Sequence, residues 1–129
     1  GVHCSIMRLI VLLLCLLSGY ASAHQFTPTY PTLELSHITG VYKAEMLLFN
    51  TRKEIRYYSL NVFDEEWNPI RFASESKLIA MDYQERKYVD IYISKTDVKR
   101  AKYICSKSKI LQSVRNPSIV ASRICSKIK

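Results

Sequence analysis

Glycine is scarce in this sequence, which has three glycines among 129 residues. Loops that cradle phosphate groups need several glycines at fixed spacings, so the composition excludes a loop of that kind. Histidine is equally scarce, and neither His24 nor His37 lies in a motif with the spacing of metal ligands. Because the sequence offers no nucleophile paired with a base and no metal cluster, we expect a protein that is not an enzyme, with no catalytic residue, no metal and no cofactor.

Acidic residues are missing from the last quarter of the chain. Residues 98–129 hold nine Lys and Arg residues and no Asp or Glu, in a chain with a formal net charge of +8. Such a block is typical of a solvated face that aids solubility. The sharper alternative is a surface that binds an anionic partner.

Long apolar runs are missing after residue 23. The one such run, Leu9–Leu17, follows Met7 and one arginine and precedes small and polar residues that end in Ala-Ser-Ala. Its nine residues are too few to cross a bilayer as a helix, which takes about 20. A basic start, an apolar run and an Ala-x-Ala end are typical of a cleavable signal peptide. We therefore predict a signal peptide over 1–23, with Met7 as its first residue and 1–6 as upstream read-through.

Residues 24–129 have a length that fits one domain with a single core. No segment among them is apolar enough to span a bilayer. We therefore predict an exported protein, periplasmic or secreted, that consists of one domain and has no transmembrane segment after signal cleavage.

Only two cysteines follow the predicted cleavage site, Cys105 and Cys125. In an oxidising compartment two cysteines make one candidate bridge, so we predict a disulfide between them. The alternatives are two free buried thiols or a metal pair. A pair with no companion His or Cys nearby is a poor zinc site, because zinc takes four ligands.

Apolar and polar residues alternate repeatedly after residue 23, whereas helical periodicity does not recur. The alternation is plainest in 87–93, where Val89, Ile91 and Ile93 point one way and the residues between them point the other way. It also marks 41–49 and 55–63 as strands. The turn chemistry at the start of 50–54 predicts a hairpin or a short corner between those two.

Shorter strands complete the predicted architecture. Residues 31–35 predict an edge strand, since Pro31 has no amide donor, and the polar cluster 64–69 predicts a loop. The other strand candidates are 70–72, 77–81, 101–110 and 118–128. About seven strands at this spacing predict an all-β fold, an immunoglobulin-like β-sandwich.

Tyrosine is frequent, and two features of its placement are informative. Tyr103 stands two residues before Cys105 at the start of a late strand, which is the tyrosine-corner arrangement of immunoglobulin-like sandwiches. Tyr88 and Tyr92 lie on the polar side of their strand, where a ring can contact a partner. Tyrosines interleaved with Lys and Arg can form a nucleic-acid platform, but the predicted export argues against a nucleic-acid partner, and β-propensity explains the tyrosines.

Several stretches resemble a known family, the N-terminal immunoglobulin-like domain of periplasmic pilus-assembly chaperones, with the PapD-like fold. They are Tyr-Pro-Thr-Leu-Glu-Leu at 30–35, Ala-Glu-Met-Leu-Leu-Phe-Asn-Thr at 44–51 followed by a basic turn, Tyr-Tyr-Ser-Leu-Asn-Val-Phe at 57–63, and Val-Ala-Ser-Arg-Ile at 120–124. The resemblance covers most of the chain after residue 23.

The resemblance implies that the last strand lends alternating apolar side chains to an incomplete pilin-like subunit, while basic residues anchor the terminal carboxylate of that subunit. The comparable strand here offers Ile119 and Ala121 on one face, and Arg123 as the anchor. Cys125 stands where the family has a second basic residue, and serines interrupt the apolar ladder. The residues expected to bind the partner are Arg123, Lys127, Ile119, Ala121, Lys107 and Lys109.

We therefore expect an exported, pilus-chaperone-like binding module that engages an extended segment of an exported partner protein, such as a pilin-like subunit, during assembly of a surface structure. The alternative is a secreted structural or adhesive β-sandwich that binds anionic envelope surfaces through its positive charge.

Overall fold

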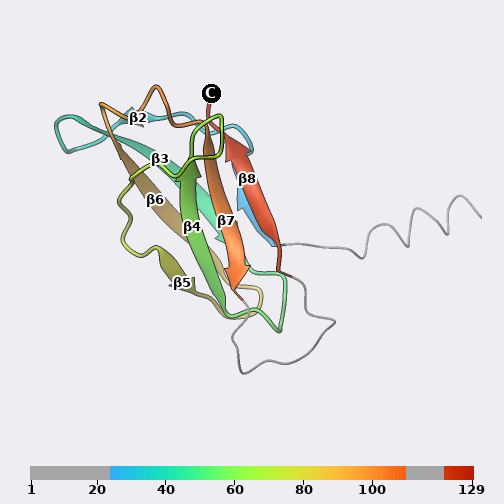
Figure 1. The fold of residues 1–129 in the computed structure, drawn as a ribbon. Helices are drawn as coiled ribbons and strands as arrows, with labels where there is room; N and C mark the ends of the chain where they lie inside the picture. The colour runs from blue at the N-terminus through green and yellow to red at the C-terminus, as the bar shows by residue number, and fades with distance from the viewer. Residues whose placement is uncertain (1–23, 110–120) are drawn as a thin grey trace, which may run out of the picture.

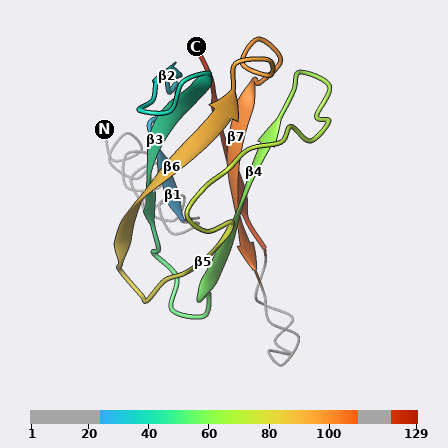
Figure 2. The ribbon, with the colours of Figure 1, turned by 90° about the vertical axis from the view of Figure 1, so that its left-hand side faces the viewer.

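The computed structural model describes residues 24–109 and 121–129, which form eight strands in two antiparallel sheets packed face to face (Figures 1 and 2). The predicted signal peptide and Ile119 lie outside the described residues. The strands are β1 (Gln25–Thr27), β2 (Glu34–Leu35), β3 (Val41–Phe49), β4 (Tyr57–Phe63), β5 (Leu78–Ala80), β6 (Arg86–Ser94), β7 (Tyr103–Lys109) and β8 (Arg123–Lys127). The predicted all-β sandwich is therefore confirmed.

The first sheet is built around β3. All nine residues of β3 pair with β6, from Val41 opposite Ser94 to Phe49 opposite Arg86. The other edge of β3 carries two short strands, with β1 on its C-terminal part and β2 on its N-terminal part. The edge strand predicted at 31–35 is thus confirmed, although only its last two residues form the ladder.

The second sheet has the strand order β5-β4-β7-β8. Its longest ladder joins all seven residues of β4 to β7, and β8 follows β7 in a hairpin-like pairing. Figure 1 views β4, β7 and β8 from outside the sandwich, with β3 and β6 behind them. β8 is an edge strand of this sheet.

The core lies between the two sheets, where the predicted alternation places it. On β3 and β6 the buried side chains include Met46, Leu48, Ile91 and Ile93, each fully inaccessible to solvent. On β4 they are Tyr58, Leu60 and Val62, as the alternation predicted. The other face of each sheet is therefore directed away from the core.

Two connections pass from one sheet to the other. Of the two alternatives predicted for residues 50–54, the structure has the corner and not the hairpin, because β3 and β4 belong to different sheets. The predicted strand at 70–72 is wrong. Ile70 donates to Val62 in one sheet and Ala73 exchanges hydrogen bonds with Tyr92 in the other, so this segment crosses between the sheets and belongs to neither ladder.

β1 was not predicted, because three residues are too few to display an alternation. Among residues 24–109 and 121–129 there is no helix that could span a bilayer.

Candidate partner-binding surfaces

The hydrogen bonds around β8 fix the direction of each of its backbone groups. Ile128 donates to Lys102 at 2.8 Å, and Ser108 donates to Ser122 at 2.9 Å. Backbone hydrogen-bonding directions alternate along an antiparallel strand. The backbone N–H and C=O groups of the even-numbered residues of β8 therefore point to β7, and those of the odd-numbered residues point to the free edge.

Part of that free edge is already occupied by the start of the described chain. Lys127 donates to the carbonyl of Thr29, and Lys129 donates to that of Pro31, both at 2.9 Å. The open part of the edge is thus confined to the backbone groups of Arg123 and Cys125. Among the described residues the open edge is therefore shorter than the whole strand, because a segment remote in sequence covers its C-terminal half.

The four basic residues predicted to bind a partner lie on one surface. Lys107 and Lys109 on β7 and Arg123 and Lys127 on β8 are exposed, and strand alternation points all four away from the core. Lys107 is directly opposite Arg123. We call these four residues the basic face.

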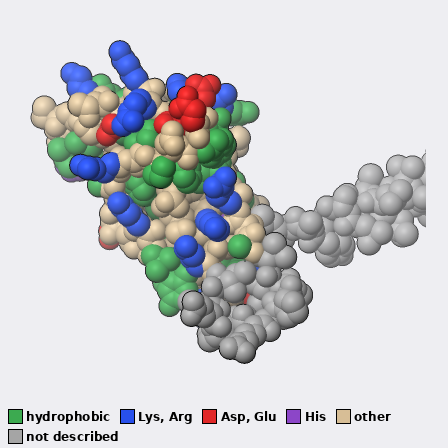
Figure 3. All heavy atoms as spheres, in the orientation of Figure 1, with side chains coloured by type: hydrophobic (Ala, Val, Ile, Leu, Met, Phe, Trp, Pro, Cys, Tyr) green, Lys and Arg blue, Asp and Glu red, His purple; other side chains and the backbone are tan. Residues whose placement is uncertain are grey.

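No acidic residue shares the outer side of the second sheet within its described strands. Figure 3 shows Lys and Arg side chains spread over this side, while the largest group of acidic side chains lies near its upper end. Ala121 is exposed just before β8, and the predicted contact Ile119 lies outside the described residues.

Within the part of the chain that the structure describes, the side chain of Arg123 contacts aromatic rings and no carboxylate. Its guanidinium lies 5.2 Å from the ring centroid of Trp67 and 5.6 Å from that of Phe63. Trp67 in turn stacks on Tyr103, with parallel rings 4.2 Å apart. Cation–π contacts of this kind hold an arginine in place without neutralising its charge, so Arg123 keeps its charge available for an anion.

Trp67 is held by a turn that the predicted loop at 64–69 forms. The carboxylate of Asp64 accepts hydrogen bonds from the backbone amides of Asn68 and Glu66, at 2.8 and 2.9 Å, and these bonds hold the pKa of Asp64 below its usual value. Trp67 has a positive φ of 66°, which is uncommon for a bulky side chain. The turn thus fixes an exposed tryptophan against the face that carries Arg123.

The tyrosine corner predicted at Tyr103 is wrong. Within the described residues its hydroxyl makes no hydrogen bond, and its ring lies on the outer side of the sheet against Trp67. The spacing to Cys105 was a coincidence of strand position. Trp67 and Phe63 were missed as site residues, and a lone tryptophan inside a polar turn was the only signal in the sequence that pointed to them.

Cys105 and Cys125 are directly opposite each other on β7 and β8 and form a disulfide, with their Cα atoms 4.1 Å apart. The predicted bridge is confirmed, and the free-thiol and metal alternatives are excluded. Closing a loop with a sequence separation of 20 stabilises the fold by about 3 kcal/mol on the chain-entropy model. The bridge also anchors β8 beside its open edge.

A buried polar cluster surrounds His24. Its ring nitrogens lie 3.0 Å from the hydroxyl of Ser122 and 2.8 Å from that of Ser106. Burial lowers the pKa of His24 to about 4, so the imidazole is neutral at neutral pH. Since His24 and Ser106 are 1% exposed or less, no substrate reaches this pair, and its arrangement suits a structural role.

A second polar group next to it closes the same end of the core. The ring of Tyr58 lies 4.6 Å from that of His24, and its hydroxyl donates to the side-chain oxygen of Asn50 at 2.5 Å. Burial raises the pKa of Tyr58 to about 12. The Asn50 amide donates to the carbonyls of Ile55 and Asp82, which fixes the corner between the two sheets.

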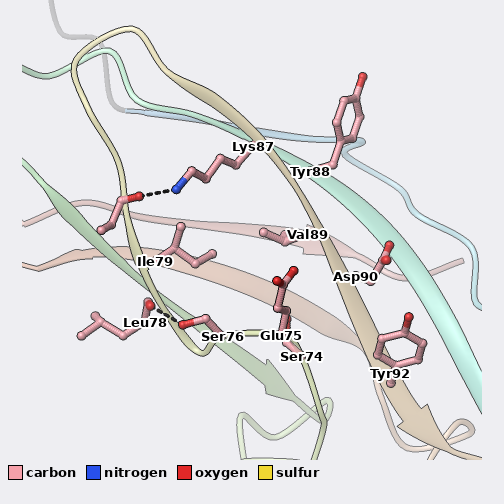
Figure 4. Close-up of a pocket in the computed structure, with 11 residues that line it drawn as sticks. Ser74, Glu75, Ser76, Leu78, Ile79, Lys87, Tyr88, Val89, Asp90 and Tyr92 are labelled. Atoms are coloured by element: carbon pink, nitrogen blue, oxygen red, sulfur yellow. Dashed lines mark hydrogen bonds between the residues drawn. The ribbon is translucent and has the colours of Figure 1, made fainter.

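The opposite side of the sandwich has a groove of about 690 Å³ between β5 and β6 (Figure 4). Ile79 and Val89 contribute apolar side chains to its lining. The Lys87 side chain extends across it, and its ammonium donates to the carbonyl of Ala80 at 2.7 Å. This groove was not predicted, because its walls belong to two different sheets.

A similar fold occurs in the crystal structure of the E. coli chaperone DraB, with a TM-score of 0.59 and 14% sequence identity. The match covers 82% of this chain and 53% of that chain, so this chain spans about half the length of the chaperone. The likeness confirms the chaperone-like fold expected from the sequence. No protein-family model and no curated protein matches the sequence.

Proposed function

We propose that this protein is an exported, non-catalytic binding module of the pilus-chaperone-like type, which engages an extended segment of an exported partner protein. The open edge at Arg123 and Cys125, with the basic face beside it, is the observation that carries this proposal. An incoming strand can hydrogen-bond to that edge, since its backbone donors and acceptors have no partner among the described residues. The fold shared with the chaperone DraB supports the same conclusion.

The positive charges beside the open edge indicate which chemical groups a partner would carry. Lys107, Lys109 and Lys127 lie on the outer side of the sheet, and none of them makes an ion pair within the described residues. A carboxylate or another anionic group on the partner would therefore meet uncompensated positive charge next to the open edge. Arg123 has the best fixed position for such a group.

A second candidate function rests on the basic face alone. Four cations without an acidic neighbour on the outer side of the sheet would also hold the protein to anionic envelope surfaces. In that case the edge of β8 plays no part. Salt distinguishes the two functions, because exposed charges are screened at about 1 M salt, whereas backbone hydrogen bonds and apolar contacts persist.

The test places a photo-crosslinking amino acid at position 121 of the full chain, expressed in its native host, because Ala121 is exposed just before β8 and its replacement retains Arg123. We expect cross-links to one exported protein that persist at about 1 M salt and map to a segment with alternating apolar residues. The matched control carries the same amino acid at Lys95, an exposed cation in the turn after β6, and forms no such cross-link.

Two outcomes would contradict the proposal. Identical cross-linking patterns at positions 121 and 95 would mean that the β8 edge binds no partner. Cross-links that disappear at high salt, together with release of the protein from the envelope, would establish electrostatic adhesion in place of strand addition.

A further inference from the structure

The edge of β6 beside the groove is open for pairing. Asn50 donates to Glu85 at 3.0 Å and Lys95 donates to Gly40 at 2.9 Å, so the odd-numbered residues of this strand bond to β3. The even-numbered ones face the free edge, as the paired hydrogen bonds between Tyr92 and Ala73 confirm.

The backbone groups of three residues remain open on this edge, namely Arg86, Tyr88 and Asp90. No other described segment bonds to them. The groove of about 690 Å³ next to Tyr88 and Asp90 leaves space for another strand. Figure 4 shows the ring of Tyr88 pointing away from Leu78 and Ile79, and Tyr88 is 71% exposed.

The charges along this edge are complementary to those of the same edge in a second copy that runs antiparallel to it. In an antiparallel pair centred on Tyr88, the residue opposite Arg86 is Asp90 of the second copy, and the residue opposite Asp90 is Arg86 of the second copy. Tyr88 then lies opposite Tyr88 of the second copy. All three positions are of the hydrogen-bonded type, so each residue contributes its amide and its carbonyl.

Neither charge has an ionic partner among the described residues of one copy. Arg86 lies over the ring of Phe49 at 4.0 Å and contacts no carboxylate among the described residues. Asp90 is directly opposite Glu45 on β3, a pairing of like charges that is unfavourable across strands. A cation brought to Asp90 from the open edge would relieve that repulsion.

The length of the open edge also fits this register. Ala73 occupies the edge at Tyr92 through its hydrogen bonds. In this register Tyr92 is opposite Gln84 of the second copy, and Gln84 precedes β6. The pairing therefore ends where Ala73 begins, and Ala73 occupies no position that the second strand needs. In the same register Val89, which lines the groove together with Ile79, is opposite Lys87 of the second copy.

We propose that β6 is a self-association edge, at which two copies pair antiparallel about Tyr88 and join their β3–β6 sheets into one. The occupant is a second copy of this chain, chosen because the edge is complementary to itself in charge. This inference concerns the side of the sandwich opposite β8 and does not depend on the proposed function.

The test measures the association of the purified, disulfide-bonded protein by sedimentation equilibrium from about 10 μM to about 1 mM. We expect a monomer–dimer equilibrium in which Asp90→Arg weakens association about tenfold or more, because it places like charges opposite each other twice. The double variant Arg86→Asp with Asp90→Arg restores the complementarity and returns the dissociation constant to within about threefold of the original. Glu65→Arg, on an exposed loop, serves as the charge-matched control and leaves association unchanged.

A second measurement fixes the register. A Tyr88→Cys variant should form a disulfide-linked dimer in mild oxidant, since hydrogen-bonded pairs have Cα atoms about 5.5 Å apart. A Glu65→Cys variant should not form one. A protein that stays monomeric at about 1 mM, or a dimer that Asp90→Arg leaves intact while the variant remains folded by circular dichroism, would overturn the proposal.

Discussion

The inner sides of the two sheets are built from different chemistry. On β3 and β6 nearly every inward residue is apolar, and Met46, Ile91 and Ile93 are fully buried. On β7 the inward residues after Ile104 are Ser106 and Ser108, and inward serines recur on β8 and just before it. One sheet is thus held by hydrophobic burial, whereas the other also needs specific hydrogen bonds.

The difference between the two inner sides follows from the position of His24, the first described residue. His24 lies against the serine-rich inner side of β7 and β8, and its ring satisfies two of those hydroxyls. A buried hydroxyl without a partner is costly, so this part of the core depends on one residue that is remote in sequence. The outer sides differ as well, since the second sheet carries only positive charge there and the first carries both signs.

The largest expected effect is on the apolar sheet. We expect Ile91→Ala to lower the free energy of unfolding by about 3 to 4 kcal/mol, because it removes buried methylene groups and leaves a cavity between the sheets. Urea unfolding followed by circular dichroism measures this. Leu35→Ala is the control, since that side chain is 78% exposed and its loss should change stability by less than about 0.5 kcal/mol. Equal effects of the two variants would contradict the assigned core.

The serine-rich inner side of the second sheet should make the free energy of unfolding depend on pH, because it holds the titratable His24, whereas the apolar inner side of the first sheet should not. The pKa of His24 is lowered to about 4 in the folded protein, so protonation favours the unfolded chain. The stabilisation is fully present above pH 6.5 and is lost as the pH falls toward 4, by up to about 3 kcal/mol. Unfolding curves at several pH values should show this slope in the native protein and not in a His24→Asn variant.

The control for that series is the exposed His37. A His37→Asn variant should keep the pH dependence of the native protein. If it removed the slope and His24→Asn did not, the buried cluster would not be the origin of the acid sensitivity.

The smallest expected changes in stability distinguish Ser106 from Ser126, two serines on the same inner side. Ser106→Ala should cost about 1 to 2 kcal/mol, since it removes a hydrogen bond to the buried His24. Ser126→Ala should be neutral or slightly stabilising, because the buried Ser126 hydroxyl has no partner among the described residues. Thermal unfolding of the two variants side by side measures the difference. Equal losses would mean that the His24 contact adds nothing.

Much of the fold could be predicted from the sequence, because strand alternation is a local property. The inward set on 87–93 and the facing set on 55–63 follow from side chains that alternate along each strand. The disulfide followed from counting, since Cys105 and Cys125 are the two cysteines after the predicted cleavage site. The basic face followed from alternation, because the odd-numbered lysines and arginines of a strand point to the same side of the sheet.

Other features depended on contacts between residues far apart in the chain. Alternation cannot say which sheet a strand joins, so the corner at 50–54 and the crossing at 70–72 were decided only by pairing. The covering of β8 by residues 29–31, the burial of His24 and the stacking of Arg123 on Trp67 likewise have no local signal. The sequence by itself determined which side of each strand is apolar, and the tertiary structure decided which edges stay open, because an edge is defined by the absence of a neighbour that only the complete set of strand pairings reveals.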